Sequence, residues 1–511
     1  MIVAAIVAVA IGIGGAIAGS GGAAAAKRPP NVVFLLTDDQ AAHEMKALPR
    51  TRRLIGRRGV RFSRHYISFP VCCPSRVSFL TGRYMHNHGV EGNRGKRGGR
   101  RRFHALNGEA ETLPVWLNRH GYYTIHFGKY LNGYPPKNPN VPRGWDEWYG
   151  KTSQYNERAP GYRIYYDYSL LEKPRPGAKP KLVHYGARPR AYQTDVLRRK
   201  AVRAIRRVGG PATSPFYMAV NFNAPHAPFI PARRHRGSYR GAKLPKLDAF
   251  NERDISDKPR FLRRQARKLI PRSQLRLNRK ARRLRLEQLR SVDQAIAAIV
   301  RALRRRGLLR NTYLVFTSDN GAFWGEHRIS EGKYLPYDPA TRVPLLVRGP
   351  GVPRGRVSRE LVSNIDFAPT VLQLSGASAP PRFAIDGRSL VPFLRHPRRR
   401  SARPILLEGK QGPSLSTLST LEQEPSARMA TPTVTKAPPY RAVRTSRYLF
   451  VRYGSGDVEL YDMKRDPQQL RSRHRSKRYR KVRRRLGRLL ARLSRCDGAA
   501  CARSAGRLGS P

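Results

Sequence analysis

Four apolar runs, rich in β-branched and aromatic residues, each end in a polar cluster. They are NVVFLLTDDQ, YYTIHFGKYLNGY, FYMAVNFNAPHAPF and NTYLVFTSDNGAFWGEH. Continuous apolar strands separated by segments of helical length are typical of a large, mostly parallel sheet that is sandwiched by helices. Because ligands bind beyond the carboxyl ends of the strands in such α/β sheets, we expect the four polar clusters to converge at one place.

Two further segments have the periodicity of helices. Residues 282–312 carry apolar side chains at three- and four-residue spacing, and Gly307 follows as a stop signal. This pattern predicts a helix that packs on the sheet and leads into a strand at 312–317. The segment 361–377 reads as a strand and then a helix, with Pro369 near the start of the helix.

The pattern changes near residue 400, which predicts a boundary between two units. Residues 27–400 form the large α/β domain, and the Ser-, Thr- and Pro-rich segment 401–439 is predicted to be a long loop. Residues 440–511 are predicted to form a small α+β subdomain. It combines an antiparallel sheet with a basic helix at about 473–495.

The segment 1–26 is apolar and ends in small residues, as in a secretory signal with an A-x-A cleavage site. It has no Lys or Arg in its leading part, and its length is borderline for a membrane span. A cleaved signal peptide and a retained N-terminal anchor therefore both stay open. Both predict a secreted or extracytoplasmic protein, with a membrane contact only if the segment is uncleaved.

The chain has four cysteines, and they divide into two pairs. Export favours an oxidising compartment, so Cys496 and Cys501, separated by four residues that include a glycine, are predicted to form a disulfide. Cys72 and Cys73 are adjacent, and adjacent cysteines rarely bridge each other because the ring is strained. A chemical role for one of them is therefore open.

Charge is the unusual feature of the composition. The 101 Lys and Arg against 33 Asp and Glu give a formal net charge of +68. Such a field attracts polyanions. Two interpretations stay open: a solvated surface with inflated arginine usage, or selection for an acidic polymer. We expect no nucleic acid partner.

The polar clusters offer two kinds of chemistry. Asp38, Asp39, Asp319 and Asn320 are an oxygen-only set that suits Ca²⁺ or Mg²⁺ better than zinc, although each pair alone is also typical of a turn or cap. Arg76, Lys129 and Lys333 can bind an oxyanion, and His226 can protonate a leaving oxygen, although each is also common at a surface or turn. Trp145, Trp148 and Trp324 are expected in the core or in a cleft wall.

The stretch CCPSRVSFLTGRY, which starts at Cys72, resembles the sulfatase signature Cys-x-Pro-Ser-Arg-x-x-x-Leu-Thr-Gly without a gap. TDDQ, GKY, APHAPF and TSDNG…GEHRISEGK resemble the other blocks of the formylglycine-dependent sulfatase family, in the same order. The resemblance extends from about residue 30 to the C-terminal subdomain. It implies an alkaline-phosphatase-like fold and a catalytic domain over 27–400.

The resemblance also implies a modification. The first cysteine of the motif, Cys72, is oxidised to Cα-formylglycine by a separate formylglycine-generating enzyme that reads the proline and arginine, and Cys73 falls on a variable position. The aldehyde is hydrated to a diol. One hydroxyl attacks sulfur and expels the alcohol, and the second lets the sulfate leave, so that no water has to attack a crowded anionic centre.

Site roles follow from the same resemblance. The formylglycine at Cys72 completes a set of ligands for one Ca²⁺ together with Asp38, Asp39, Asp319 and Asn320, and the metal lowers the pKa of the attacking hydroxyl. Arg76 stabilises the formylglycine, and the sulfate and leaving oxygen are contacted by Lys129, His226 and Lys333.

The sequence departs from the family pattern at one position and resembles one branch of the family more closely than the others. Many family members carry a histidine where this chain has Leu131, so the group that assists the diol is open. The blocks CCPSR, GKYLN and HNHGV look most like the N-acetylglucosamine-6-sulfatase branch. His86 and His88, in the last block, either line the pocket or cap a loop.

Three functions are compatible with these residues. The first is a sulfatase acting on a sulfated sugar or an aryl sulfate. The second is a phosphomonoesterase or phosphodiesterase of the same superfold, which would use Ser or Thr and two metals held by extra His and Asp. The third is a non-catalytic, secreted polyanion-binding protein, which would require that Cys72 is never matured.

Overall fold

A large mixed sheet forms the centre of the molecule. The computed structural model describes residues 28–135, 140–153, 164–208, 214–245, 247–410 and 436–503. In the described part the strand order is β10-β2-β9-β8-β1-β7-β3-β4-β5-β6. The strands of this sheet are β1 Asn31–Thr37, β2 Val60–Tyr66, β3 Tyr123–Gly128, β4 Glu147–Lys151, β5 Tyr168–Lys173, β6 Lys181–Tyr185, β7 Phe216–Asn221, β8 Thr312–Ser318, β9 Leu345–Arg348 and β10 Arg356–Ser363.

The central strands β8, β1, β7 and β3 are neighbours and run parallel. Their carboxyl ends are level, since Thr37 pairs with Ser318 and Asn221 pairs with both Leu36 and Gly128. β9 is antiparallel to β2 and β8, and β5 is antiparallel to β4 and β6. The predicted large, mostly parallel sheet is therefore confirmed, with antiparallel additions that the sequence pattern did not predict.

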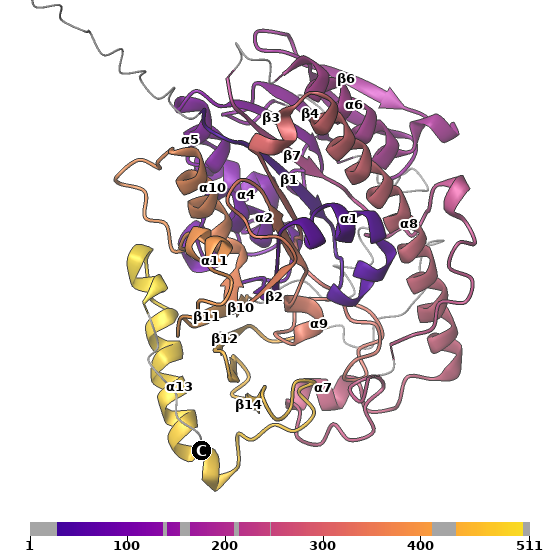
Figure 1. Cartoon of the computed structure of the whole chain (residues 1–511). Coiled ribbons are helices and arrows are strands. Elements are labelled where there is room, and N and C mark those ends of the chain that lie inside the picture. Colours follow the sequence, from indigo (N-terminus) through magenta and orange to yellow (C-terminus); the bar gives the residue numbers. More distant parts are fainter. Residues whose placement is uncertain are drawn as a thin grey trace, which may run out of the picture.

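Helices cover both faces of the sheet (Figure 1). Alternate residues of β1 face opposite sides, because successive side chains of a strand point to opposite faces. Val33 and Leu35 join the core under α1, α6 and α8, and Val32 and Phe34 join the core under α2, α5 and α10. The α-helices are α1 Pro49–Leu54, α2 Cys72–Thr81, α3 Met85–His88, α4 Gly99–Ala105, α5 Leu113–Arg119, α6 Gln193–Arg207, α7 Arg260–Gln265, α8 Arg272–Arg305, α9 Asp338–Thr341, α10 Phe367–Ser375, α11 Val391–Arg395 and α13 Arg480–Leu493.

A second, four-stranded antiparallel sheet forms the C-terminal unit, in the order β11-β12-β13-β14. Its strands are β11 Ile405–Gly409, β12 Tyr440–Arg444, β13 Tyr448–Tyr453 and β14 Val458–Asp462. The amphipathic helix α13 covers one face of this sheet (Figure 1), where Leu486 and Leu490 pack with Val443 and Phe450. The predicted small antiparallel sheet with a basic helix is confirmed.

Two boundaries of the C-terminal unit differ from the prediction. β11 lies inside the range 401–439, so the prediction of one continuous loop there is wrong at its start. The run Ile405–Gly409 is short and fully buried. Because polar residues flank it, the composition of the surrounding segment does not indicate a strand. The helix α13 is shorter than 473–495. Residues 411–435, which make up most of the predicted loop, lie outside the described residues.

The predicted disulfide is present between Cys496 and Cys501, directly after α13. The predicted signal or anchor at 1–26 lies outside the described residues. None of the described helices combines the length and the hydrophobicity that crossing a membrane requires.

Candidate active site

The predicted site residues lie at the level carboxyl ends of the four central strands. Asp38 follows β1, Asp319 follows β8 and Lys129 follows β3, while His226 comes five residues after β7. Backbone hydrogen bonds hold the exits together, since Asp319 N–H donates to the Thr37 carbonyl and Lys129 N–H donates to the Asn221 carbonyl. The convergence of distant clusters that the sequence predicted is therefore what the structure shows.

Cys72 is the first residue of α2 and is fully buried against these strand ends. Its Sγ lies 2.9 Å from Lys333 Nζ and 3.5 Å from Asp38 Oδ1. Burial raises the pKa of the Cys72 thiol well above its usual value, although Lys129 and Lys333 act against this. Because the thiolate is the reactive form of cysteine, the unmodified thiol is a poor nucleophile here.

Cys73 has a different environment although it is the next residue. Its Sγ accepts a hydrogen bond from the Asn132 N–H at 2.9 Å and lies 3.3 Å from Asn132 Oδ1. Its backbone N–H donates to Asn93 Oδ1. Cys73 therefore joins α2 to the segment after β3, while Cys72 faces the charged cluster.

Arg76 lies one helical turn after Cys72 and is buried. Its Nε donates to Asp319 Oδ2 at 2.8 Å and its Nη1 donates to the Lys129 carbonyl at 2.9 Å, while Nη2 lies 3.7 Å from Asp38 Oδ2. Burial alone would lower the pKa of Arg76, but Asp319 and Asp38 raise it above its usual value. Arg76 thus holds the two carboxylates in place, and its predicted contact with a formylglycine stays a prediction.

Lysines pair with the two aspartates that follow β1. Lys129 Nζ lies 2.6 Å from Asp38 Oδ2, and Lys333 Nζ lies 2.6 Å from Asp39 Oδ1. Burial would raise the pKa of both carboxyls, but nearby cations, led by Lys129 for Asp38 and by Lys333 for Asp39, lower both pKa values below the usual range. His226 Nε2 lies 3.6 Å from Asp39 Oδ2. The site therefore holds Asp38 and Asp39 as carboxylates.

Asp319 behaves differently. Its two carboxyl oxygens accept hydrogen bonds from the Asp39 N–H at 3.0 Å and from Arg76 Nε. Burial, together with the charge of Asp38, raises the pKa of Asp319 to about 6. Three carboxyl groups thus crowd one buried place, which is an arrangement that a divalent cation relieves.

The donor set fits a cation that prefers oxygen. Asn320 Nδ2 donates to Asp39 Oδ1 at 2.6 Å, while the buried Asn320 Oδ1 has no hydrogen-bond partner among the described residues. A buried carbonyl oxygen without a partner is unfavourable unless something else binds it. Ligand atoms of Asp38, Asp39, Cys72 and His226 also lie within 4.8 Å of one another, the only such group among the described residues. His226 therefore adds a possible ligand to the predicted set.

Arg285 lies in α8, is buried behind the site and is not among the predicted site residues. Its guanidinium donates to the carboxylate of Glu44 and to the carbonyls of Asp39 and Pro225, and it stacks over Trp324. Arg285 thereby joins the segment after β1 to the residue before His226. A signal was present, because Arg285 follows Ala281 by four residues and precedes Leu289 by four on the apolar stripe of the predicted helix.

The remaining predicted residues lie around the site. Leu131 is buried in the core beside α2 and brings no polar group. Trp145, Trp148 and Trp324 are buried, as expected for core residues. His88 Nδ1 accepts the Val90 N–H, which is the loop-capping alternative.

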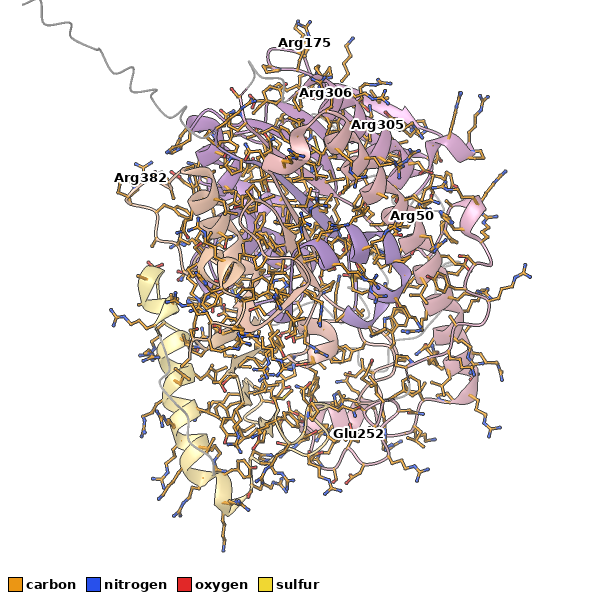
Figure 2. All side chains as sticks on the ribbon, viewed as in Figure 1. Arg50, Arg175, Glu252, Arg305, Arg306 and Arg382 are labelled. Carbon is orange, nitrogen blue, oxygen red and sulfur yellow. A yellow bond between two sulfur atoms is a disulfide. The ribbon has the colours of Figure 1, made fainter. Side chains whose placement is uncertain are left out.

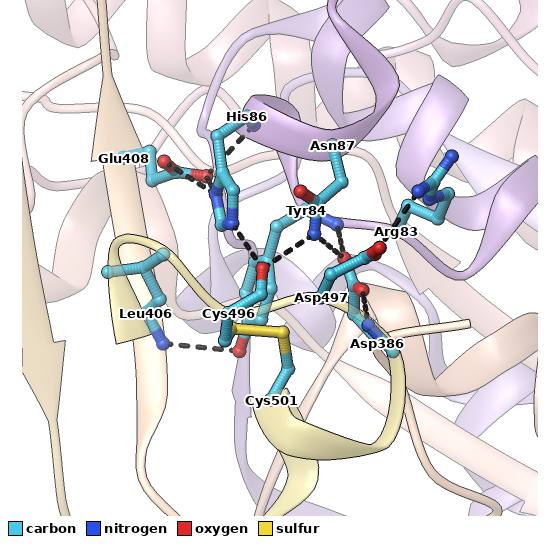
Figure 3. The surroundings of a disulfide bond; sticks show 11 residues. Arg83, Tyr84, His86, Asn87, Asp386, Leu406, Glu408, Cys496, Asp497 and Cys501 are labelled. Atoms are coloured by element: carbon cyan, nitrogen blue, oxygen red, sulfur yellow. Dashed lines mark hydrogen bonds and ion pairs between the residues drawn. A yellow bond between two sulfur atoms is a disulfide. The ribbon is translucent and has the colours of Figure 1, made fainter. Parts of the chain in front are cut away.

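His86 connects two segments of the C-terminal unit (Figure 3). Its Nδ1 lies 3.0 Å from Glu408 Oε1, and its Nε2 lies 2.9 Å from the Cys496 carbonyl. Asn87 Nδ2 donates to the same carbonyl and to Asp386. The loop closed by the disulfide therefore packs on α3, which follows α2 in the chain.

Comparison with known proteins decides the family. A family model described as Sulfatase matches residues 30–377, which is more than half of the chain. The chain belongs to the sulfatase family. This sulfatase is 32% identical over 486 residues to the N-acetylglucosamine-6-sulfatase of Capra hircus, with 90% of this chain and 81% of that protein covered.

Two further matches show how much of a longer relative this chain spans and which fold it has. At 32% identity it matches a sulfatase Sulf-1 homolog of Caenorhabditis elegans over 74% of its length, but it spans only 51% of that protein. Its fold is similar to a solved structure described as a complex with its substrate D-glucosamine-2-N,6-O-disulfate, with a TM-score of 0.72, 23% identity, and coverage of 91% and 97%. The predicted alkaline-phosphatase-like fold is confirmed, and the chain is an enzyme of the sulfatase family.

Proposed function

We propose that this enzyme hydrolyses the sulfate ester of a sulfated sugar, N-acetylglucosamine-6-sulfate being the first candidate, with aryl sulfates as small substrates. The observation that carries the proposal is the placement of Cys72 at the N-terminus of α2, 2.9 Å from Lys333 and beside Asp38. Similarity to N-acetylglucosamine-6-sulfatases over most of the chain supports the choice of sugar. Extracellular sulfatases among the relatives support an extracytoplasmic location.

Cys72 supplies the nucleophile after its conversion to formylglycine by a separate maturing enzyme. The hydrated aldehyde supplies one hydroxyl to attack sulfur and a second hydroxyl whose proton loss lets the sulfate leave. The buried thiol, whose pKa is raised, would be a weak nucleophile without this conversion. The N-terminus of α2, a helix of ten residues, adds a positive partial charge beside the reacting group.

One calcium ion is the proposed cofactor. Asp38, Asp39, Asp319 and Asn320 would hold it together with the modified residue 72, and the partnerless Asn320 Oδ1 supports this assignment. The bound ion supplies Lewis-acid stabilisation of the attacking oxygen. A two-metal phosphatase is less well supported, because a second group of potential ligands is absent from the described part of the chain.

The other residues bind and protonate. Lys129 and Lys333 place two positive charges beside Cys72, where they can bind the anionic sulfate. His226 Nδ1 faces the Ala227 carbonyl at 2.5 Å, which leaves Nε2 directed to the carboxylate side. We assign to His226 the transfer of a proton to the leaving oxygen. Arg76 holds Asp319 and Asp38 in place.

The test uses the full chain produced together with a formylglycine-generating enzyme. Sulfate release is measured from N-acetylglucosamine-6-sulfate, from the same sugar sulfated at another position, and from a chromogenic aryl sulfate. Release from the 6-sulfate with little release from the other isomer is expected. Hydrolysis of a matched phosphate ester at a higher rate than any sulfate ester would overturn the proposal.

A further inference from the structure

A cavity of about 510 Å³ lies at one end of the small C-terminal sheet. It is bounded by the end of β11, the start of β12, the end of β13 and the last turn of α13. We call it the C-terminal groove. Its lining includes the cations Lys410, Arg441, Arg452 and Arg495 and the rings of Tyr440 and Tyr453.

The cations of the C-terminal groove are crowded. Arg441 and Arg452 are direct cross-strand partners on β12 and β13, and both are exposed. Like charges at such positions destabilise a sheet. Among the described residues, no carboxylate forms an ion pair with Arg441, Arg452 or Arg495. The fold therefore carries an electrostatic cost here that an anionic ligand would relieve.

The one carboxylate in the lining does not neutralise this charge. Glu408 is buried, and both of its oxygens lie 3.0 Å from His86 Nδ1. Lys410 pairs with Glu91, which lies outside the lining. The groove thus keeps an excess of positive charge beside two aromatic rings.

Hydrogen bonds of two tyrosines connect the groove to the catalytic centre. Tyr440 OH donates to the Tyr334 carbonyl, and Tyr334 OH donates to the Lys410 carbonyl, each at 2.5 Å. Tyr334 directly follows Lys333, whose Nζ reaches Cys72 Sγ. Tyr440 and Tyr334 therefore link the groove to Lys333.

We propose that the C-terminal groove binds a sulfated saccharide segment, as a second site for units of the substrate polymer that are not being hydrolysed. This rests on the proposed function, because it assumes a sulfated glycan as substrate. Arginine forks match the geometry of sulfate oxygens. The cavity volume lies within the range of about 300–1,000 Å³ that is usual for ligand sites.

Binding is tested apart from turnover, in a Cys72→Ala background that cannot be matured. The probe is a size-defined heparin hexasaccharide, titrated by calorimetry at fixed salt, with a fully desulfated hexasaccharide as the comparison. The test variant is Arg441→Gln/Arg452→Gln. The matched control, Arg305→Gln/Arg306→Gln, removes two exposed arginines at the C-terminal end of α8, on the distant side of the molecule (Figure 2). The melting temperature of each variant is measured to establish that it folds.

The test variant is expected to weaken hexasaccharide binding about tenfold or more. The control pair should change it by less than about twofold. Equal losses in both pairs would show that diffuse surface charge, not the groove, binds the probe, and would overturn the proposal. It would also be overturned by equal binding of the desulfated probe, or by single-stranded DNA competing as well as the hexasaccharide does.

Failure of the proposed function gives a different result. If the matured, unsubstituted enzyme hydrolyses no sulfate ester, the proposed function fails whatever the hexasaccharide does. If it hydrolyses sulfate esters but the two arginine pairs bind the hexasaccharide alike, only the groove proposal fails.

Discussion

At the residue scale, the two adjacent cysteines occupy different environments, and this difference predicts opposite results for their substitution. Cys72→Ala removes the group to be modified and should lower kcat/KM on an aryl sulfate by about 1,000-fold or more. Cys73→Ala removes only an acceptor for the Asn132 N–H, so activity should stay within about tenfold of the parent enzyme. Steady-state kinetics of both variants check this. Retained activity in Cys72→Ala with loss in Cys73→Ala would contradict the assignment.

Arg285 is predicted to act as a positioning residue. Arg285→Met removes the donors that hold the Asp39 and Pro225 carbonyls, and should lower calcium affinity and kcat by about 10- to 100-fold. Arg285→Lys should restore part of the loss. Calcium titration and kinetics on the folded variants measure both effects.

Arg444→Met is the matched control, because Arg444 is also buried but contacts Thr445 and, at the end of β2, Tyr66. It should lower the melting temperature without changing calcium affinity. Equal losses of calcium affinity in the Arg285 and Arg444 variants would show that Arg285 has only a general structural role.

The residues of the site could be predicted from the sequence, because they directly follow apolar runs or belong to a motif with fixed spacing. Asp38, Lys129 and Asp319 each follow an apolar run that could only be a buried strand. Arg285 was missed because a charge inside a very arginine-rich helix is usually interpreted as a surface residue, although its position on the apolar stripe of α8 agrees with the inward-facing guanidinium. The bridge from His86 to Cys496 also depends on a contact between segments about 410 residues apart.

At the scale of elements, the level ends of β1 and β8 bring the proposed calcium ligands together. Metal analysis of the purified protein should give about one equivalent of calcium. Chelation should remove activity, and added calcium should restore it. Asn320→Ala, which deletes the partnerless buried oxygen, should weaken calcium binding more than Asn364→Ala, which alters a buried amide that binds Ser75. A stoichiometric pair of zinc ions would contradict the single-calcium assignment.

The contact of α3 with β11 and the disulfide loop predicts a pH dependence of stability. Burial lowers the pKa of His86, but its hydrogen bond with Glu408 and the nearby acidic charges raise it above its usual value overall. A raised folded-state pKa gives stability that is fully present below the unfolded value of about 6.5 and is lost as the pH rises through the folded value. His86→Gln should flatten the fall of melting temperature above pH 6.5.

His396→Gln is the control for this experiment, because His396 is exposed. It should leave the pH dependence of the melting temperature unchanged. If His86→Gln keeps the same slope as the parent enzyme, the protonated bridge to Glu408 is not a source of stability.

The elements differ in how well the pattern predicts them. Long periodic segments such as α8, and the buried strands β1 and β8, are evident from spacing alone. Short strands are not: β11 has five residues and β9 has four, and each is set by its pairing with distant strands. The antiparallel direction of β9 depends on a tertiary arrangement that no local pattern encodes.

At the scale of the whole molecule, the net charge of +68 exceeds what one sulfate group requires. Figure 2 shows long, nitrogen-bearing side chains projecting outward around the molecule, among them Arg175, Arg305 and Arg382. The Debye length falls from about 30 Å at 0.01 M to about 8 Å at 0.15 M ionic strength. We therefore expect kcat/KM on a sulfated polysaccharide to fall steeply with added salt, and kcat/KM on a small aryl sulfate to fall much less.

The contributors to this steering are expected to include the basic residues at about 262–290 and 473–495. Replacing several exposed arginines there by glutamine should flatten the salt dependence on the polymer. An equal response of polymer and aryl sulfate to salt would indicate instead that the arginine excess is a solvated surface without a role in capture.

We propose above all that a formylglycine at position 72 makes this chain an active sulfatase. Mass spectrometry of the peptide spanning residues 65–83, from protein produced with and without a formylglycine-generating enzyme, tests it most directly. We predict the mass of an aldehyde in place of the thiol at Cys72, an intact thiol at Cys73, and aryl sulfatase activity in proportion to the converted fraction. Full activity in protein whose Cys72 is an unmodified thiol would contradict the account.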